Sequence, residues 1–151
     1  MTAVGFYHLT RTPLEAALPK LLEKARAAGL QVLVLTGSPE RSAALDSLLW
    51  TYDPDSWLVH GTAKDGLEDA PLHPIWISDQ DENRNRAECL VLVDGAESAR
   101  LGDYVRCLDL FDGRDESAVA AARARWSKAK EAGHALTYWQ QTESGGWSEK
   151  K

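Results

Sequence analysis

The chain has 151 residues and a net charge of −6, with 44% hydrophobic and 26% charged residues, values typical of one globular domain. It holds no apolar run near the roughly 18 residues that a membrane-spanning helix needs, and its first residues lack the pattern of a signal peptide. We therefore expect a single domain over residues 1–151, no membrane association and a cytoplasmic location. Cys89 and Cys107 lie in apolar segments and are expected to be buried thiols, with a disulfide or a reactive cysteine as the alternatives.

The first half of the chain alternates short apolar strands with amphipathic helices. Residues 5–9 have the pattern of a strand, and a helix is predicted over 12–29, because Thr-Pro suits its first turn and a glycine ends it. The apolar run 31–35 predicts a strand that is buried on both faces. A second helix is predicted over 38–50, and residues 51–74 are expected to form a long irregular connection with a short edge strand at 57–60.

The second half continues the alternation. Strands are predicted at 75–77, 88–93 and 104–111, and an alanine-rich helix is predicted over 115–132. The polar, glycine-rich residues from about 142 to 151 are expected to form a flexible tail. Strands that alternate with helices indicate an α/β fold with a mostly parallel central sheet and helices on both faces.

Motifs for nucleotide binding or catalysis are missing from the positions where an α/β fold would carry them. The chain contains neither the glycine-rich dinucleotide fingerprint nor a P-loop. The turn at Thr36-Gly37-Ser38 suits either an anion or, more simply, a capped helix start. Asp94-Gly95 suits either a catalytic carboxylate or a tight turn. A small transferase or hydrolase that acts at these strand ends is the rival hypothesis to a binding role.

No residue set has the spacing of a metal site, so we expect neither a metal nor a cofactor. The acidic cluster Asp79, Asp81 and Glu82 is compatible with a divalent cation, although a solvated turn is the simpler interpretation. The cysteines lack a C-x-x-C arrangement, and no two histidines have the i, i+4 spacing of a metalloenzyme helix; these histidines are His8, His60, His73 and His134.

The window 121–132 is strongly basic on an acidic chain. It holds four cations and one glutamate, a net charge of +3, which leaves −9 for the other residues. Such a patch is poorly suited to tracking nucleic acid and suits a short acidic ligand. On a helix, Trp126 lies on the apolar face, with Arg123 and Lys130 along one edge and Arg125 along the other. The alternatives are a core tryptophan with solvated cations, or an apolar notch whose guanidinium groups bind carboxylates.

Short segments spread over about residues 4–140 resemble, in their order and spacing, the chi subunit family of bacterial DNA polymerase III. They are Phe6-Tyr7, Val32-Leu33-Val34, Leu45-Asp46-Ser47-Leu48-Leu49-Trp50, Trp57 with His60, Pro74-Ile75-Trp76-Ile77, Ala124-Arg125-Trp126 and Ala132-Gly133. The resemblance implies a Rossmann-like three-layer sandwich without a nucleotide site. It also implies a non-catalytic subunit that has no cofactor. Direct contact with nucleic acid is not expected, because the net charge disfavours it.

The resemblance implies two protein partners as well. The first is the single-stranded DNA-binding protein, whose acidic, aromatic-ended C-terminal tail meets the last helix of the family. By position, Arg123 matches the family's key arginine and Trp126 its aromatic wall. Ser127 stands where a lysine is common, so Lys128 or Lys130 is expected to replace that lysine, with Arg125 adding attraction.

The second implied partner is the psi subunit, which many bacteria use to connect chi to the clamp loader of the DNA polymerase III holoenzyme. The psi-binding surface of the family is apolar and lies away from the tail site. Its candidates in this sequence are Trp50, Trp57, His60 and Trp76, with core packing as the alternative for at least one of the three tryptophans.

Overall fold

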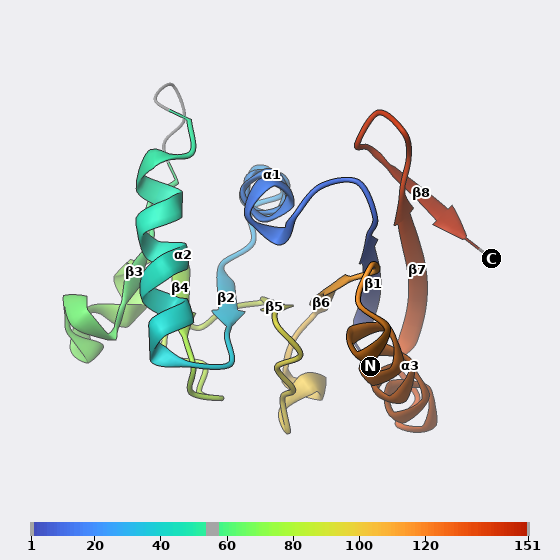
Figure 1. Cartoon of the computed structure of the whole chain (residues 1–151). Coiled ribbons are helices and arrows are strands. Elements are labelled where there is room, and N and C mark those ends of the chain that lie inside the picture. The colour runs from blue at the N-terminus through green and yellow to red at the C-terminus, as the bar shows by residue number, and fades with distance from the viewer. Residues whose placement is uncertain (1, 54–57, 151) are drawn as a thin grey trace.

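The computed structural model describes residues 2–53 and 58–150, which form one eight-stranded sheet with helices on both faces (Figure 1). The strand order is β3-β4-β2-β5-β6-β1-β7-β8, and the neighbouring strands are parallel except for the antiparallel pair β7–β8. The strands are β1 (Ala3–Leu9), β2 (Val32–Leu35), β3 (Gly61–Thr62), β4 (Ile75–Ser78), β5 (Cys89–Leu92), β6 (Arg106–Asp112), β7 (Ala135–Gln141) and β8 (Trp147–Lys150). The helices are α1 (Leu14–Ala27), α2 (Pro39–Thr51) and α3 (Glu116–Glu131), with short 3-10 turns η1 (Ala63–Asp65), η2 (Leu67–Leu72) and η3 (Leu101–Asp103).

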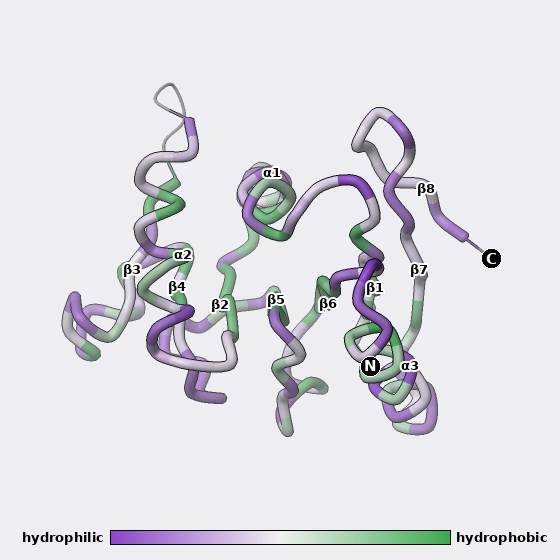
Figure 2. The backbone as a smooth tube through the Cα atoms, viewed as in Figure 1, coloured by the Kyte–Doolittle hydropathy of each residue, from purple (hydrophilic) through white to green (hydrophobic). Residues whose placement is uncertain are grey.

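The central strands are buried on both faces, which creates the two halves of the core. Val32 and Val34 of β2 pack with residues of α1 and α2, whereas the alternate residues Leu33 and Leu35 belong to the cluster that includes α3. Figure 2 shows the hydrophobic residues along β2 and the hydrophilic ones at the end of β8. The predicted α/β fold, a Rossmann-like three-layer sandwich with a mostly parallel sheet, is therefore confirmed.

The helix over the basic window begins and ends close to the predicted residues. Asp115 is its N-cap, and the carboxylate accepts hydrogen bonds from the backbone N–H groups of Ser117 at 2.9 Å and Ala118 at 3.4 Å. Gly133 follows the helix with φ of 87°, a conformation that favours glycine. The start of α1 differs from the prediction, because Pro13 is the N-cap and no side chain caps the helix there.

The C-terminal residues form a hairpin, which corrects the prediction of a flexible tail from about residue 142. Residues 147–150 form β8, which pairs with β7, and the glycine-rich segment before β8 makes the turn, closed by a 2.9 Å hydrogen bond from Thr142 N–H to the Gly146 carbonyl. Aromatic contacts hold the hairpin on the sheet. The Tyr7 ring lies 6.0 Å from that of Trp139 and 5.0 Å from that of Trp147, centroid to centroid.

Two further predictions are settled by the fold. Cys89 and Cys107 are free, buried thiols, as expected, and burial raises the pKa of Cys89 to about 12. The edge strand lies at Gly61–Thr62, and residues 58–60 of the predicted segment 57–60 are not in a strand, whereas residue 57 lies outside the described residues. Within the described part of the chain, none of the helices is both long and apolar enough to cross a membrane.

Candidate functional site

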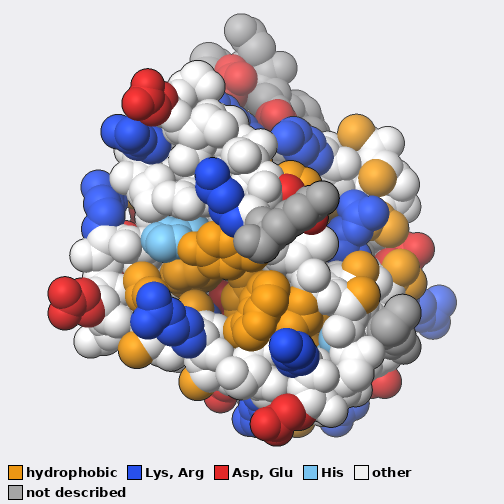
Figure 3. All heavy atoms as spheres, turned by 90° about the vertical axis from the view of Figure 1, so that its right-hand side faces the viewer, with side chains coloured by type: hydrophobic (Ala, Val, Ile, Leu, Met, Phe, Trp, Pro, Cys, Tyr) orange, Lys and Arg blue, Asp and Glu red, His pale blue; other side chains and the backbone are white. Residues whose placement is uncertain are grey.

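A pocket of about 650 Å³ lies between α3 and the strands β1, β7 and β8, and we call it the α3 pocket. Figure 3 shows this face of the molecule, with hydrophobic side chains around a hollow and Lys and Arg side chains at its margin. The pocket is therefore an apolar depression with a cationic border. Its lining residues are Phe6, His8, Phe111, Val119, Ala122, Arg123, Trp126, Leu136, Thr137, Tyr138, Glu149 and Lys150.

Trp126 and its aromatic neighbours form a continuous wall of the α3 pocket. The Trp126 ring meets Phe6 edge-on at a centroid distance of 5.2 Å and Tyr138 at 6.4 Å. The Tyr138 hydroxyl is hydrogen-bonded to His8 Nδ1, and the two rings lie 5.8 Å apart. Trp126 packs against the core cluster and also lines the pocket, so it is only partly buried. The wall is held in place before any ligand arrives.

Arg123 supplies an available positive charge at the border of the α3 pocket. Its side chain is exposed and forms no ion pair with any residue that the structure describes. It lies close enough to Tyr138 to act on that hydroxyl: burial raises the pKa of Tyr138, and the nearby Arg123 charge opposes the rise. Arg123 thus offers guanidinium donors beside an apolar surface, the arrangement that recognises a carboxylate attached to a hydrophobic group.

Arg125 is not a surface cation, which corrects its assignment to the binding patch. It is buried, and its Nε and Nη2 atoms donate to the two carboxylate oxygens of Asp109 at 2.6 and 3.0 Å. Two positions along a helix correspond to a rotation of about 200°, so Arg123 and Arg125 face different surroundings. Asp109 lies among the apolar, buried residues in the middle of β6, where a carboxylate needs a partner, and this sequence signal could have predicted the pair.

The remaining predicted cations of α3 lie outside the α3 pocket. Lys128 lines a different pocket, of about 390 Å³, which also contains Arg125. Ser127 and Lys130 are exposed on α3 and are not part of the lining of either pocket. The structure therefore brings Arg123 and Trp126 together in one site and separates them from Lys128. The sequence interpretation missed Tyr138 and Lys150, because their segments were not expected to pair beside α3.

The C-terminal ends of the parallel strands were the candidate location for catalysis, and their polar groups bind one another. Arg41 donates to Glu15 at 2.6 Å and to Asp94 at 2.7 Å, and its hydrogen bond lowers the pKa of Glu15. Ser38 caps α2 by accepting from the Arg41 backbone N–H at 3.1 Å, so the turn at 36–38 is a capped helix start. Asp94 has φ of 55° in the turn after β5, as the tight-turn alternative expected.

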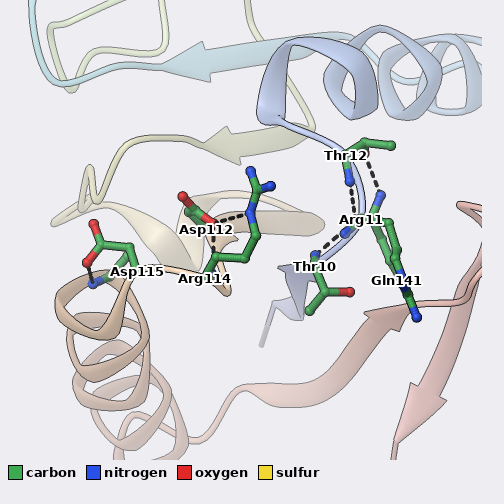
Figure 4. Close-up of polar contacts among 8 residues, drawn as sticks. Thr10, Arg11, Thr12, Asp112, Arg114, Asp115 and Gln141 are labelled. Carbon is green, nitrogen blue, oxygen red and sulfur yellow. Dashed lines mark hydrogen bonds and ion pairs between the residues drawn. The ribbon is translucent and has the colours of Figure 1, made fainter.

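The backbone N–H groups of the loop after β1 are also bound by another part of the same chain. In a nucleotide-binding α/β sheet the backbone N–H groups of this loop and the following helix hold phosphate. Here the side-chain oxygen of Gln141 accepts from the N–H groups of Thr10, Arg11 and Thr12 at 3.0, 2.8 and 3.1 Å (Figure 4). The Gln141 side-chain amide donates to the Thr12 hydroxyl at 2.6 Å. The buried Gln141 side chain therefore satisfies the donors that a phosphate would need.

The acidic turn has a structural role of the same kind. Asp81 accepts from Ser98 Oγ at 2.7 Å and from the backbone N–H of Ala99 at 2.8 Å, which fixes the loop after β5. Within the described residues, no three His, Cys, Asp or Glu side chains are grouped in a way that could hold a metal ion.

The tryptophans proposed as a partner surface have different environments. Trp76 lies in β4, whose edge is covered by β3, and its side chain is fully buried and packs with Ala70 of η2. Its assignment to a surface is therefore wrong. His60 is 3% exposed, which excludes it in the same way, and the ring of Trp50 covers it at a centroid distance of 4.4 Å. Trp50 is 57% exposed, and Leu72 of η2 is 78% exposed. Trp57 lies outside the described residues.

The comparison with protein families bears on the same elements. The model of the family described as "DNA polymerase III chi subunit, HolC" matches residues 1–137, from β1 through α3 into β7. The chain belongs to this family. Its membership confirms the resemblance found in the sequence and identifies a DNA polymerase III subunit family with an accessory role in replication.

One curated chi relative adds to this assignment. The "Probable DNA polymerase III subunit chi" of Rickettsia prowazekii (strain Madrid E) is 27% identical over 111 residues, which cover 74% of this chain and 66% of the relative. The match thus spans slightly less than two thirds of the relative's length. It supports the family, and the partners of this chi-family chain are argued below from its own site.

Proposed function

We propose that this chi-family chain is a non-catalytic replication adaptor that binds the acidic C-terminal tail of the single-stranded DNA-binding protein in the α3 pocket. It links that protein to the DNA polymerase III clamp loader, through psi where psi is present, in the cytoplasm. The observation that carries the proposal is the position of the exposed Arg123, which has no ion pair with a described residue, beside the aromatic wall of Trp126 and Tyr138.

The chemistry of the α3 pocket suits the end of such a tail. A hydrophobic terminal side chain fills the hollow against Trp126 and Phe6, where it is removed from water. A carboxylate on the same peptide meets the guanidinium of Arg123 in a charge-assisted hydrogen bond. The two interactions reinforce each other only when the ligand carries an apolar group and a negative charge close together.

The charge of the whole chain favours a local peptide contact over nucleic acid. The net charge of −6 repels phosphate chains at long range, whereas the exposed cations in the second half of α3, Arg123, Lys128 and Lys130, attract an acidic segment to one place. Attraction of this kind is screened by salt, so the affinity for an acidic peptide should fall as ionic strength rises.

Replacing Arg123 by alanine should weaken peptide binding by about 1–3 kcal/mol, or roughly five- to 150-fold in Kd, because a charge-assisted contact is lost. The measurement is calorimetric titration of the full chain with a synthetic peptide of consecutive aspartates that ends in phenylalanine with a free carboxylate. Stability should change by less than about 0.5 kcal/mol, since the side chain is exposed.

Lys20→Ala provides the matched control, because it removes an exposed cation from α1 on the other face of the sheet. Its Kd should stay within experimental error of the parent protein. Equal binding by the parent and the Arg123→Ala variant would show that the α3 pocket is not the tail site.

For psi, the structure favours the end of the sheet that carries Trp50. Trp50 and Leu72 are large apolar side chains that water reaches, and exposed groups of this kind are frequent in protein interfaces. Trp76 and His60 are buried and take no part in this proposal. The strand-end groups Arg41, Glu15 and Asp94 bind one another, which supports the binding role over the rival enzyme hypothesis.

A further inference from the structure

We infer that the C-terminal strand β8 forms a second charged wall of the α3 pocket, in which Lys150 contacts an acidic side chain of the bound peptide. The inference rests on the proposed function and extends it to a residue beyond the region that the family model matches, residues 1–137. It assigns the β7–β8 hairpin a part in recognition, in addition to its place in the sheet.

The register of the hairpin places Lys150 on the pocket side of the sheet. Lys150 pairs with Tyr138 in the antiparallel ladder, and directly opposed residues of such a pair project to the same face. Tyr138 is part of the aromatic wall that meets Trp126, so Lys150 stands beside that wall. The packing of Trp147 against Tyr7 at 5.0 Å fixes the start of β8 and therefore this register.

Lys150 is as available to a ligand as Arg123 is. It is exposed and forms no ion pair with a described residue, whereas Arg84, Arg114 and Arg125 each pair with a carboxylate. Among the described residues, the lining of the α3 pocket thus has a cation without an ion pair on α3 and another on β8, with the apolar hollow between the two elements. A peptide whose apolar end fills the hollow can reach Arg123 with one carboxylate and Lys150 with another.

Glu149, the neighbour of Lys150, lies at the edge of the α3 pocket, but its side chain alternates to the opposite face of the sheet, the face on which Trp147 contacts Tyr7. Its carboxylate points away from the hollow, so removal of this charge should change binding little. A pair of adjacent residues of which only Lys150 affects binding separates electrostatic recognition from general damage to β8, because damage would weaken binding at both positions.

The test is a fluorescence anisotropy titration of the full chain at low salt, with labelled aspartate-rich peptide that ends in phenylalanine. Lys150→Ala should raise Kd about two- to fivefold, the range for one exposed charge pair, and Lys150→Glu should raise it about tenfold. Glu149→Gln should leave Kd within experimental error of the parent, because this side chain lies on the opposite face of the sheet. A second peptide, with asparagine in place of every aspartate, should reduce the effect of Lys150→Ala to none.

The outcomes separate the inference from the proposed function. If Arg123→Ala weakens binding while the Lys150 and Glu149 variants match the parent on both peptides, the β8 wall has no role and the tail site stands. If all of these variants bind as the parent does, both proposals are wrong. A third outcome is that the Lys150 and Glu149 variants weaken binding alike and that the Trp147 indole resonance changes, which reports loss of the Trp147 contact. In that case β8 acts only as a structural support, and the inference is overturned.

Discussion

Replacing Arg125 by methionine is expected to lower the free energy of unfolding by about 3–5 kcal/mol, the usual cost of leaving one member of a buried ion pair without its partner. Arg125 and Asp109 form a bidentate contact in which the side chains are 8% and 2% exposed. Methionine has a similar length and fills the space, so the loss is electrostatic rather than a cavity. Urea denaturation of the parent and variant measures it.

Two controls identify the cause of this loss. The double variant Arg125→Met with Asp109→Leu should recover most of the stability, because both charges are then absent from the core. Arg123→Met, two residues away on an exposed position, should change stability by less than about 0.5 kcal/mol. A double variant that is as unstable as Arg125→Met alone would mean that the ion pair is not the source of the effect.

The loss should also depend on pH in a defined direction. Burial raises the pKa of Asp109, and the hydrogen bond from Arg125 opposes that rise. Without Arg125 the folded-state pKa of Asp109 rises further above the unfolded value of about 3.9. The variant therefore loses most unfolding free energy at pH values where Asp109 must be ionised. The difference in stability between parent and variant should therefore grow as the pH increases from the ordinary carboxyl range to neutrality.

Replacing Trp76 by alanine should destabilise the fold by about 3–5 kcal/mol, because it leaves a large cavity that the surrounding side chains fill only in part. Trp76 is fully buried in β4 between β2 and β3, and it packs with Ala70 on the α3 side of the sheet. Thermal unfolding followed by circular dichroism measures the change as a lower Tm.

Trp50→Ala is the matched variant at the same end of the sheet. Its side chain is 57% exposed, so the change in unfolding free energy should be well under that of Trp76→Ala. Similar losses for the two tryptophans would contradict the burial described here. A folded Trp50→Ala variant is also the right protein with which to test the contribution of this surface to psi binding.

The order of strands and helices was predictable from the sequence because the local patterns agree with the fold. The run Val32–Leu35 is apolar without interruption and becomes a strand buried on both faces, and α3 begins at Asp115 and ends before Gly133 as their residue types favour. The C-terminal hairpin was missed because its strand β8 is polar and its pairing depends on contacts of Trp147 with the distant Tyr7.

The site was predictable in part, and the errors have physical causes. Helical periodicity placed Trp126 and Arg123 together, and the structure puts both in the α3 pocket. The periodicity gave no information on which cation has a buried acidic partner, and the pairing of Arg125 with Asp109 depends on how α3 packs against β6. The burial of Trp76 was equally unpredictable from the sequence, because it depends on whether another strand covers the edge of β4.

The location of the peptide site can be tested most directly with the indole N–H resonances of the tryptophans, followed by heteronuclear NMR as the aspartate-rich peptide is added. Single Trp→Phe variants at positions 126 and 50 assign the two signals that matter. The α3 pocket predicts that the Trp126 resonance shifts with the peptide while the exposed Trp50 resonance stays in place. A Trp50 resonance that shifts while that of Trp126 does not would contradict the proposed site.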